Sequence, residues 1–357
     1  MKIIHCSDLH LDSRMETNLS SKKAKERNQE ILLTFERLVQ YAENEGVSII
    51  MLAGDLFDTN RISASSVDYF LNEVRNAQDI DFLYLKGNHD ESKYAFEAEI
   101  LPDNLKLFSD VWTSYTYDFL TISGIEMNYD NESSLYDELR LDSKQTNIVM
   151  MHGQEATQPG VDMVCLPRLR NKGIDYLALG HIHSYKKDKL DERGSYAYCG
   201  CLEGRGFDEC GEKGFLLLDV ESQQIKTSFI PFAKRQLHDL HVDITGKEKI
   251  TEIKQAMEAV SAKIDTNDLV KFTLEGEYTF ETQKDFDFLL KVFSNQFYFV
   301  KIKDMTHLKI EKENYEHDIS LKGEFIRNVM ASNLSDDEKE EIICAGIQAL
   351  SAKEIKL

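Results

Sequence analysis

The fold is decided by residues 47–58, which read VSIIMLAGDLFD. The first seven form a mostly apolar run, as expected of a short strand buried on both faces of a parallel sheet. The last five, GDLFD, place two carboxylates directly after that strand. The same order, an apolar run followed by polar groups, recurs at residues 82–90, 147–153 and 174–183. It predicts parallel strands that carry functional groups at their carboxyl ends.

The segments between these strands have helical and hairpin patterns. Residues 22–44 carry apolar side chains at helical spacing, and Gly46 is placed to end that helix. Residues 64–77 form a second helical stretch, and residues 105–125 and 195–231 look like hairpins. This order predicts an α/β fold, a four-layer α/β/β/α sandwich. The stretch 128–143 is an acidic, loop-like insertion to which the sequence assigns no chemistry.

After Pro231 the pattern changes to a β-α-β-α-β order, and two amphipathic helices follow. Ser335 with Glu338 forms a predicted capping box for the second helix. These helices either pack on their own domain or offer a docking face to a partner, and both interpretations stay open. The expected parts are a large first domain, 1–231, a small α+β capping domain, 232–312, and a C-terminal helical segment, 320–357.

Composition restricts the class of protein. The 357 residues suggest two domains, and 42% hydrophobic with 29% charged residues is typical of a folded chain. No window is apolar enough for a membrane span, and the N-terminus lacks the regions of a signal peptide, so a cytoplasmic location is expected. The six cysteines are irregularly spaced and are expected to be free thiols. Cys199, Cys201 and Cys210 lack the C-x-x-C spacing of a structural zinc site.

The net charge of −21 argues against a large nucleic-acid-binding face. Proteins that hold duplex nucleic acid usually present basic surfaces, because phosphate contacts and counterion release supply much of the affinity. Neither residues 1–230 nor residues 231–357 are basic. Any contact with nucleic acid must therefore be short, local or supplied by a partner.

Five short motifs, each after an apolar run, contain the residue types that bind divalent metals. They are DLH at 8–10, GDLFD at 54–58, GNHD at 87–90, HG at 152–153 and GHIH at 180–183. A single histidine at a strand end is more often packed or exposed than a ligand, but five such motifs in order are not expected by chance. A site with two metals clamps the attacking and leaving oxygens of a phosphate ester during in-line displacement. The motifs therefore predict phosphoester hydrolysis.

Taken together, the five motifs resemble those of the calcineurin-like metallophosphoesterases. Two further segments are IHCSDLHLDS at 4–13 and GCLEGR at 200–205, the latter followed by GEKG at 211–214. They are similar to segments of SbcD-type DNA-repair exonucleases, especially of the YhaO-like branch. The resemblance is specific over the first 220 residues or so and only general in layout beyond residue 231.

The resemblance implies a set of metal ligands. It assigns Asp8, His10 and His183 to one metal, assigns Asn88, His152 and His181 to the other, and makes Asp55 the bridge. Mixed oxygen and nitrogen ligands suit manganese or iron better than calcium, and magnesium tolerates imidazole poorly. Two divalent ions are therefore expected, with manganese first and iron or magnesium as alternatives.

Four further residues have expected roles. His89 follows a ligand directly, so we expect it to stabilise the transition state and to protonate the leaving 3′-oxygen, a role typically worth about 10²–10⁴-fold. Asp58 is expected to orient His89, with a loop hydrogen bond as the alternative. Arg205 and Lys213 are expected to contact a phosphate backbone, with simple surface exposure as the alternative.

The resemblance implies a two-metal DNA phosphodiesterase, a 3′→5′ exonuclease that also nicks single strands. It would be the nuclease subunit of a complex with an SbcC-like or YhaN-like ATPase, acting on DNA ends or single strands, and a homodimer is left open. One alternative is a phosphoesterase for a small phosphodiester such as a cyclic nucleotide, or for a phosphomonoester, because a negative surface repels long polyanions. A second alternative is a non-catalytic, metal-binding scaffold.

Overall fold

The computed structural model describes residues 1–15, 19–58, 62–90, 96, 100–222, 224–280, 282–309 and 315–350. The chain divides into two compact units, Met1–Leu237 and His238–Leu357. Every predicted metal ligand lies in the first unit.

The first unit contains two six-stranded sheets. The first sheet has the order β14 (Gln224–Pro231), β13 (Gly214–Glu221), β1 (Lys2–Cys6), β2 (Val47–Ala53), β3 (Asp81–Leu85), β4 (Leu105–Leu107). The second has the order β11 (Lys186–Lys189), β12 (Ser195–Tyr198), β10 (Tyr176–Gly180), β7 (Thr146–His152), β6 (Leu120–Gly124), β5 (Thr113–Tyr117). The central strands β1 to β4, and β6, β7, β10 and β12, are parallel, as the apolar runs predicted.

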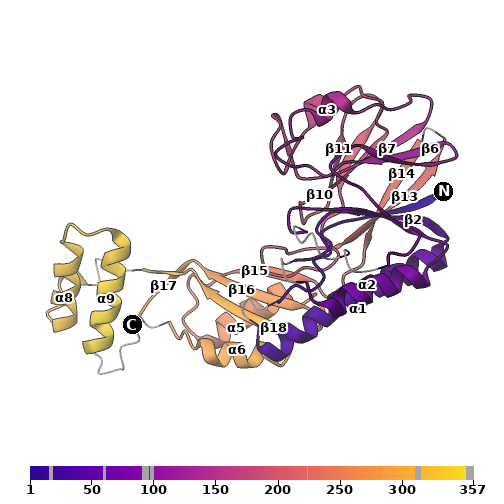
Figure 1. Ribbon diagram of the computed structural model, residues 1–357. Coiled ribbons are helices and arrows are strands. Elements are labelled where there is room, and N and C mark those ends of the chain that lie inside the picture. The colour runs from indigo at the N-terminus through magenta and orange to yellow at the C-terminus, as the bar shows by residue number, and fades with distance from the viewer. Residues whose placement is uncertain are drawn as a thin grey trace. The chain divides into compact units, whose positions relative to one another are not determined.

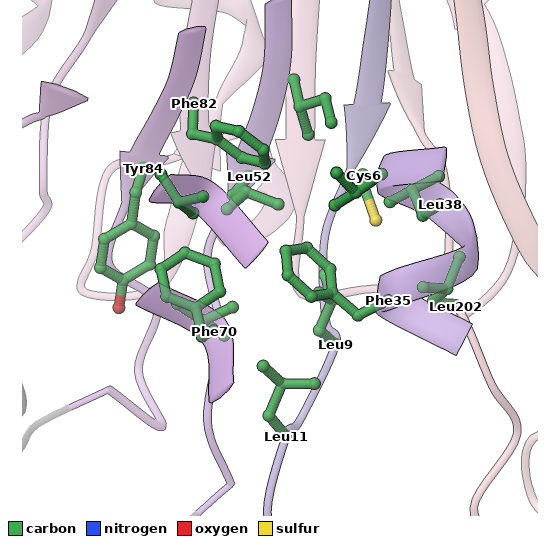
Figure 2. Packing of buried hydrophobic residues seen from close by; sticks show 14 of the residues in the cluster. Cys6, Leu9, Leu11, Phe35, Leu38, Leu52, Phe70, Phe82, Tyr84 and Leu202 are labelled. Carbon is green, nitrogen blue, oxygen red and sulfur yellow. The ribbon is translucent and has the colours of Figure 1, made fainter. Parts of the chain in front are cut away.

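Two helices cover the outer face of the first sheet. They are α1 (Ser21–Glu45) and α2 (Ala64–Asn76), which lie side by side in Figure 1. Figure 2 shows Phe35 of α1 and Phe70 of α2 packed against Leu52 and Phe82 of the sheet. Helix α1 ends as predicted at Gly46, whose φ of 65° is a left-handed conformation that glycine adopts without a Cβ clash.

Apolar side chains also fill the space between the two sheets and cover the outer face of the second. Ile49 and Met51 of β2 pack against Ile148 and Met150 of β7. On the other face of the second sheet lie the short helices α3 (Leu135–Glu138) and α4 (Leu166–Leu169). The layers are thus helix, sheet, sheet and helix, so the predicted four-layer sandwich is confirmed.

The acidic stretch 128–143 therefore has a structural role that its composition did not reveal. It contains α3, whose Leu135 and Tyr136 are fully buried against the second sheet. The Trp112 indole N–H donates to the carbonyl oxygen of Leu135 at 2.8 Å. Beside it, β8 (Gln154–Ala156) and β9 (Met163–Cys165) form a small pair. This stretch completes the fourth layer of the sandwich.

The second unit has the predicted β-α-β-α-β order. Its elements are β15 (Leu237–Asp243), α5 (Ile250–Ser261), β16 (Leu269–Glu275), α6 (Phe286–Ser294) and β18 (Phe299–Asp304), with a small β17 (Glu277–Tyr278) and β19 (His307–Leu308) pair. The three-stranded sheet has the order β15-β16-β18. Its core includes Phe272 and Phe293, whose ring centroids are 4.8 Å apart.

Two helices follow in this unit, α8 (Leu321–Met330) and α9 (Asp336–Leu350). The capping box is confirmed: the Glu338 N–H donates to Ser335 Oγ at 3.3 Å, and the Ser335 N–H donates to the Glu338 carboxylate at 2.8 Å. Helix α9 contacts the β17–β19 pair, where Cys344 Sγ lies 3.3 Å from the Tyr278 hydroxyl. The finer division into a capping domain and a helical segment, with boundaries at 231, 312 and 320, stays a prediction.

Candidate metal centre

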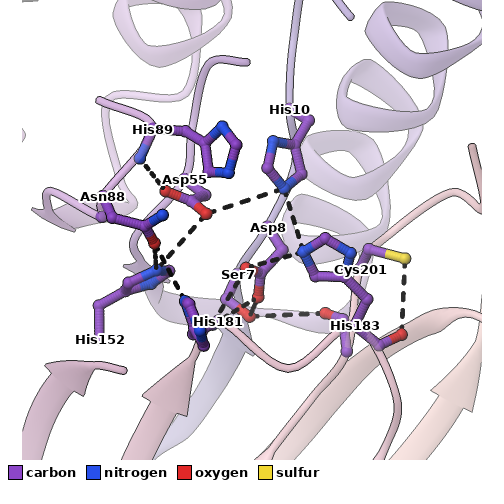
Figure 3. Close-up of polar contacts among 12 residues, drawn as sticks. Ser7, Asp8, His10, Asp55, Asn88, His89, His152, His181, His183 and Cys201 are labelled. Carbon is purple, nitrogen blue, oxygen red and sulfur yellow. Dashed lines mark hydrogen bonds and ion pairs between the residues drawn. The ribbon is translucent and has the colours of Figure 1, made fainter. Parts of the chain in front are cut away.

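Five strand ends bring the predicted ligands together (Figure 3). Strands β1, β2 and β3 of the first sheet and β7 and β10 of the second each end at or just before one of the five motifs. Because the carboxyl ends of parallel strands lie at one edge of a sheet, the loops that leave them converge. The side chains brought together are Asp8, His10, Asp55, Asn88, His152, His181 and His183.

Four of these side chains form a first cluster: Asp8, His10, Asp55 and His183 each offer a ligand atom within 4.8 Å of the others. His10 Nε2 lies 3.2 Å from His183 Nε2 and 3.9 Å from Asp55 Oδ2. His183 Nε2 is also 3.5 Å from Asp8 Oδ1. Separations of this size are those of neighbouring ligands around one ion with bonds of about 2.1 Å.

The second cluster combines Asn88, His152 and His181 with the same aspartate. Asn88 Oδ1 lies 3.0 Å from both His152 Nε2 and His181 Nδ1. His152 Nε2 is 3.4 Å from Asp55 Oδ2. One carboxylate oxygen of Asp55 therefore faces both clusters. This mixture of carboxylate, amide and imidazole donors is suited to divalent metal ions.

The backbone at the strand ends is strained in a way that aims the side chains inward. Asp8, His10 and Asp55 have φ values of 52°, 47° and 52°, and His181 has a φ of 99°. A non-glycine residue in this region costs on the order of 1–3 kcal/mol and persists only where the surroundings enforce it. Gly54 allows the chain to approach the site closely, since a Cβ there would lie 2.0 Å from His152 Nδ1. Tight turns of this kind let short side chains reach one point.

The electrostatics of the two clusters favour ionised carboxylates. Burial alone would raise the pKa of Asp8, but the hydrogen bond to His183 and the nearby histidines hold it well below its usual range. Burial would lower the pKa of His152 and of His183, but their carboxylate partners raise both to about 9. A divalent ion bound here would have to displace protons from these two rings.

His89 lies beside the ligand clusters and outside both. Its backbone N–H donates to Asp55 Oδ1 at 2.9 Å, and its ring meets that of His10 edge-on at 5.2 Å between centroids. The side chain is 45% exposed. The ring is therefore held next to the centre and still open to a substrate.

Asp58 contacts His10 more closely than His89. Its Oδ1 lies 3.0 Å from His10 Nδ1 but 3.8 Å from His89 Nδ1. The sequence predicted that Asp58 orients His89, but in the structure the shorter contact of Asp58 is to His10, a predicted metal ligand. Sequence adjacency could not show this, because either ring could have turned toward the carboxylate.

Arg205 and Lys213 are not the open basic surface that the sequence suggested. The Arg205 guanidinium donates to Asp58 Oδ1 at 2.8 Å and to Glu209 Oε1 at 2.9 Å. Lys213 is 2% exposed, and its ammonium donates to the carbonyl oxygen of His183 at 2.7 Å. Both side chains hold the loops of the site in place, and the burial of Lys213 leaves it no face for a phosphate backbone.

Glu209 is a residue that the sequence analysis missed. Its Oε1 lies 2.7 Å from His183 Nδ1, and its Oε2 accepts the Arg205 backbone N–H at 2.7 Å. Burial would raise the pKa of Glu209, but His183 and Arg205 hold it well below the usual range. Its position in the resembling segment 200–214 was a weak signal, because that segment contains other acids at equally plausible positions.

Two further aspartates near the centre hold loops in place. The carboxylate of Asp90 accepts the backbone N–H groups of Leu56, Phe57 and Gly87 at 2.9–3.1 Å, and so joins the loops after β2 and β3. Asp12 accepts the backbone N–H of Ser63, before α2, at 2.8 Å. All six cysteines are free, as expected. Among the described residues, we find no helix with the length and apolar character that a membrane span requires.

Comparison with known proteins agrees with this geometry. Residues 1–185, more than half of the chain, match the model of the calcineurin-like phosphoesterase family. The chain belongs to this family, and it is a metal-dependent phosphoesterase, a hydrolase.

Three relatives are similar over most of the chain. One is the uncharacterized metallophosphoesterase YhaO of Bacillus subtilis (strain 168), 26% identical over 287 residues, which cover 74% of this chain and 68% of the relative. Another is the DNA double-strand break repair protein Mre11 of Sulfolobus acidocaldarius, 26% identical over 292 residues, 75% of this chain and 71% of the relative. The third is the SbcD subunit of the nuclease SbcCD of Staphylococcus epidermidis, 24% identical over 396 aligned positions, 96% of this chain and 97% of the relative.

Proposed function

We propose that this chain is a two-metal phosphodiesterase that degrades DNA from 3′ ends and nicks single strands. The observation that carries the proposal is the shared Oδ2 of Asp55, which lies 3.9 Å from His10 Nε2 in one cluster and 3.4 Å from His152 Nε2 in the other. A bridging carboxylate of this kind is what a two-metal phosphoesterase requires. The names of two relatives, a DNA repair protein and a nuclease subunit, support DNA as the substrate.

The seven ligand positions divide as the family resemblance implies. Asp8, His10 and His183 would hold one ion, Asn88, His152 and His181 the other, and Asp55 would touch both. Manganese suits this mixture of donors best, with iron or magnesium as alternatives. Such ions activate water and neutralise charge on the phosphoryl oxygens.

His89 is proposed as the catalytic acid. Its half-exposed ring faces the place where a phosphodiester would meet the ligands, and its backbone is tied to Asp55. It would donate a proton to the leaving 3′-oxygen. Asp58, 3.8 Å from His89 Nδ1, is close enough to act on that ring through a small movement, although its shorter contact is to His10.

An ATPase partner would account for the charge of the chain. At a net charge of −21 the chain is poorly suited to hold duplex DNA alone. Helices α8 and α9 carry exposed apolar side chains, which we propose as the docking face for an SbcC-like or YhaN-like subunit. They are Leu321, Ile342 and Leu350, 40–68% exposed, and Leu334 in the turn between the two helices is 37% exposed.

The second candidate function is hydrolysis of a small phosphodiester or a phosphomonoester. The specific observation in its favour is the same negative charge, which repels long polyanions but hinders a nucleotide much less. The metal centre and the role of His89 would be unchanged.

The test of the proposed catalytic acid uses the full chain with manganese and a 3′-labelled DNA duplex or hairpin. His89→Gln should lower kcat by about 10²–10⁴-fold while bound manganese stays at the native level. His307→Gln, at a 72% exposed histidine of the second unit, is the matched control and should keep native activity. Native-like turnover in His89→Gln would remove His89 from the mechanism.

The substrate is tested by competition at low salt. Hydrolysis of bis-p-nitrophenyl phosphate should be inhibited by duplex DNA if the first proposal is right, and by nucleotides if the second is. Cleavage of DNA only after addition of an ATPase that co-purifies with the chain from its native cell would support the complex. A chain that binds metal and hydrolyses no ester, alone or in its complex, would instead be a scaffold.

A further inference from the structure

Two carboxylates lie behind the first cluster, which consists of Asp8, His10, Asp55 and His183. Asp58 Oδ1 is 3.0 Å from Nδ1 of His10, and Glu209 Oε1 is 2.7 Å from Nδ1 of His183. In both rings this is the nitrogen away from the cluster, since Nε2 faces the other ligands. A carboxylate at Nδ1 favours the tautomer with its proton on that nitrogen and would leave the Nε2 lone pair free for a metal ion. The contact is a hydrogen bond at His183 and a close ion-pair contact at His10.

Arg205 joins these two carboxylates. Nη1 donates to Asp58 Oδ1 at 2.8 Å, while Nη2 and Nε donate to Glu209 Oε1 at 2.9 and 3.2 Å. The Arg205 side chain is 19% exposed and that of Glu209 only 7%. Asp58 follows a strand of the first sheet, whereas Glu209 follows a strand of the second. The guanidinium therefore ties together two loops that come from different sheets.

The second cluster is anchored in a different way. His152 Nδ1 lies 2.9 Å from the main-chain oxygen of Ala53, an atom fixed by strand β2. His181 presents Nδ1 itself to Asn88 Oδ1 at 3.0 Å. The contacts that orient this pair do not pass through Arg205.

We propose that Arg205 is a positioning residue that makes the first cluster able to hold its ion, while the second cluster does not depend on it. This inference rests on the proposed function, because it takes the site to hold two ions. The planar guanidinium can bond to two carboxylates at once, which the single ammonium of a lysine cannot do with the same geometry. Without it, Asp58 and Glu209 repel each other and leave the two histidine rings without fixed partners.

The size of the expected effect follows from the role of such partners. Removal of a group that orients a metal-bound histidine typically lowers metal affinity about 10–100-fold. Arg205 supports two histidines of one cluster. The affinity for one ion should therefore fall by this factor or more, while the affinity for the other ion should not change. A general loss of structure would weaken both ions together.

The experiment titrates metal-stripped full-length protein with Mn²⁺ and follows free Mn²⁺ by electron paramagnetic resonance. The native chain should bind two equivalents. Arg205→Met and Arg205→Lys should each bind one equivalent as the native chain does and bind the second at least about tenfold more weakly. Arg168→Met, at a partly exposed arginine paired with Asp137, is the matched control and should bind two equivalents as the native chain does.

Three outcomes would overturn the inference. If Arg205→Met binds both equivalents normally and only raises KM for DNA, Arg205 contacts the substrate. If Arg205→Met weakens the binding of both equivalents of Mn²⁺ equally, Arg205 supports the fold as a whole rather than the first cluster. If Arg205→Lys binds like the native chain, charge alone suffices and the two-carboxylate geometry is irrelevant. The proposed function fails separately, when the native chain binds two ions but hydrolyses no phosphodiester.

Discussion

Substitution of Gly87 by alanine tests how closely the bridging aspartate is held. A Cβ at Gly87 would lie 2.2 Å from Asp55 Oδ1 and 2.5 Å from the Asp55 backbone nitrogen. Ordinary van der Waals contact begins near 3.4 Å, so Asp55 or the Gly87 backbone must move by about 1 Å. Asp55 is only 1% exposed, so it has little room to move toward solvent.

The displacement affects both clusters, because Asp55 Oδ2 faces both. It also disturbs His89, whose backbone N–H bonds to Asp55 Oδ1. A misplacement of about 1 Å can cost on the order of 100-fold in rate, and overpacking of a filled site costs about 1–3 kcal/mol of stability. Gly87→Ala should therefore lose at least about 100-fold in kcat and bind manganese more weakly, in a chain that still folds.

The assay combines hydrolysis of bis-p-nitrophenyl phosphate, bound manganese and urea unfolding. Gly160→Ala is the matched control, because the nearest neighbours of its Cβ would be atoms of the Met163 side chain, with the sulfur at 3.2 Å. That flexible side chain can move aside, and native activity is expected. If Gly87→Ala keeps native turnover and metal content, Asp55 is not held as closely as these contacts imply.

Three further predictions concern protons and buried charge. Burial lowers the pKa of His5 to about 4, so between pH 6.5 and pH 4 the unfolded chain binds a proton at this ring and the folded chain does not. The free energy of unfolding should therefore fall by about 3 kcal/mol over this range, and in urea unfolding of metal-free protein the fall should be smaller for His5→Gln than for the native chain. Since His152 and His183 have pKa values raised to about 9, metal binding at pH 7.5 should release about two protons. The binding enthalpy measured by calorimetry should therefore depend on the buffer, and an enthalpy that is the same in all buffers would contradict this prediction. Arg27 is 1% exposed between two carboxylates, so Arg27→Met should cost about 3–5 kcal/mol in urea unfolding, against less than about 1 kcal/mol for the surface variant Arg168→Met.

The strands and helices of the sandwich were predictable because their signal is local. The apolar run of residues 47–53 coincides with β2, and the periodicity of residues 22–44 with α1. The role of the stretch 128–143 was not predictable, because its acidic residues dominate its composition while three side chains, Leu135, Tyr136 and Leu139, do the packing. Which sheet a short segment covers depends on contacts distant in sequence.

The same distinction applies to the site. The predicted metal ligands lie at strand ends, where the parallel topology brings them together, so their motifs sufficed to predict that these side chains would cluster. The residues behind them come from loops, and their pairing depends on the path of each loop. Asp58 could have reached either His10 or His89, and nothing in the segment 200–214 singles out Glu209 from its acidic neighbours.

The geometry also changes what the acidic composition means for a DNA substrate. Four carboxylates, those of Asp8, Asp55, Asp58 and Glu209, line the centre or lie directly behind it, and the Arg205 guanidinium pairs with the last two. This excess of negative charge explains why the pKa values of the two neighbouring histidines are raised, since protons there partly balance it. Two divalent cations would replace those protons and leave the centre with a small positive charge. The net charge of −21 therefore overstates the repulsion that a phosphate meets at the point of reaction, and the partner is needed for the length of DNA beyond it.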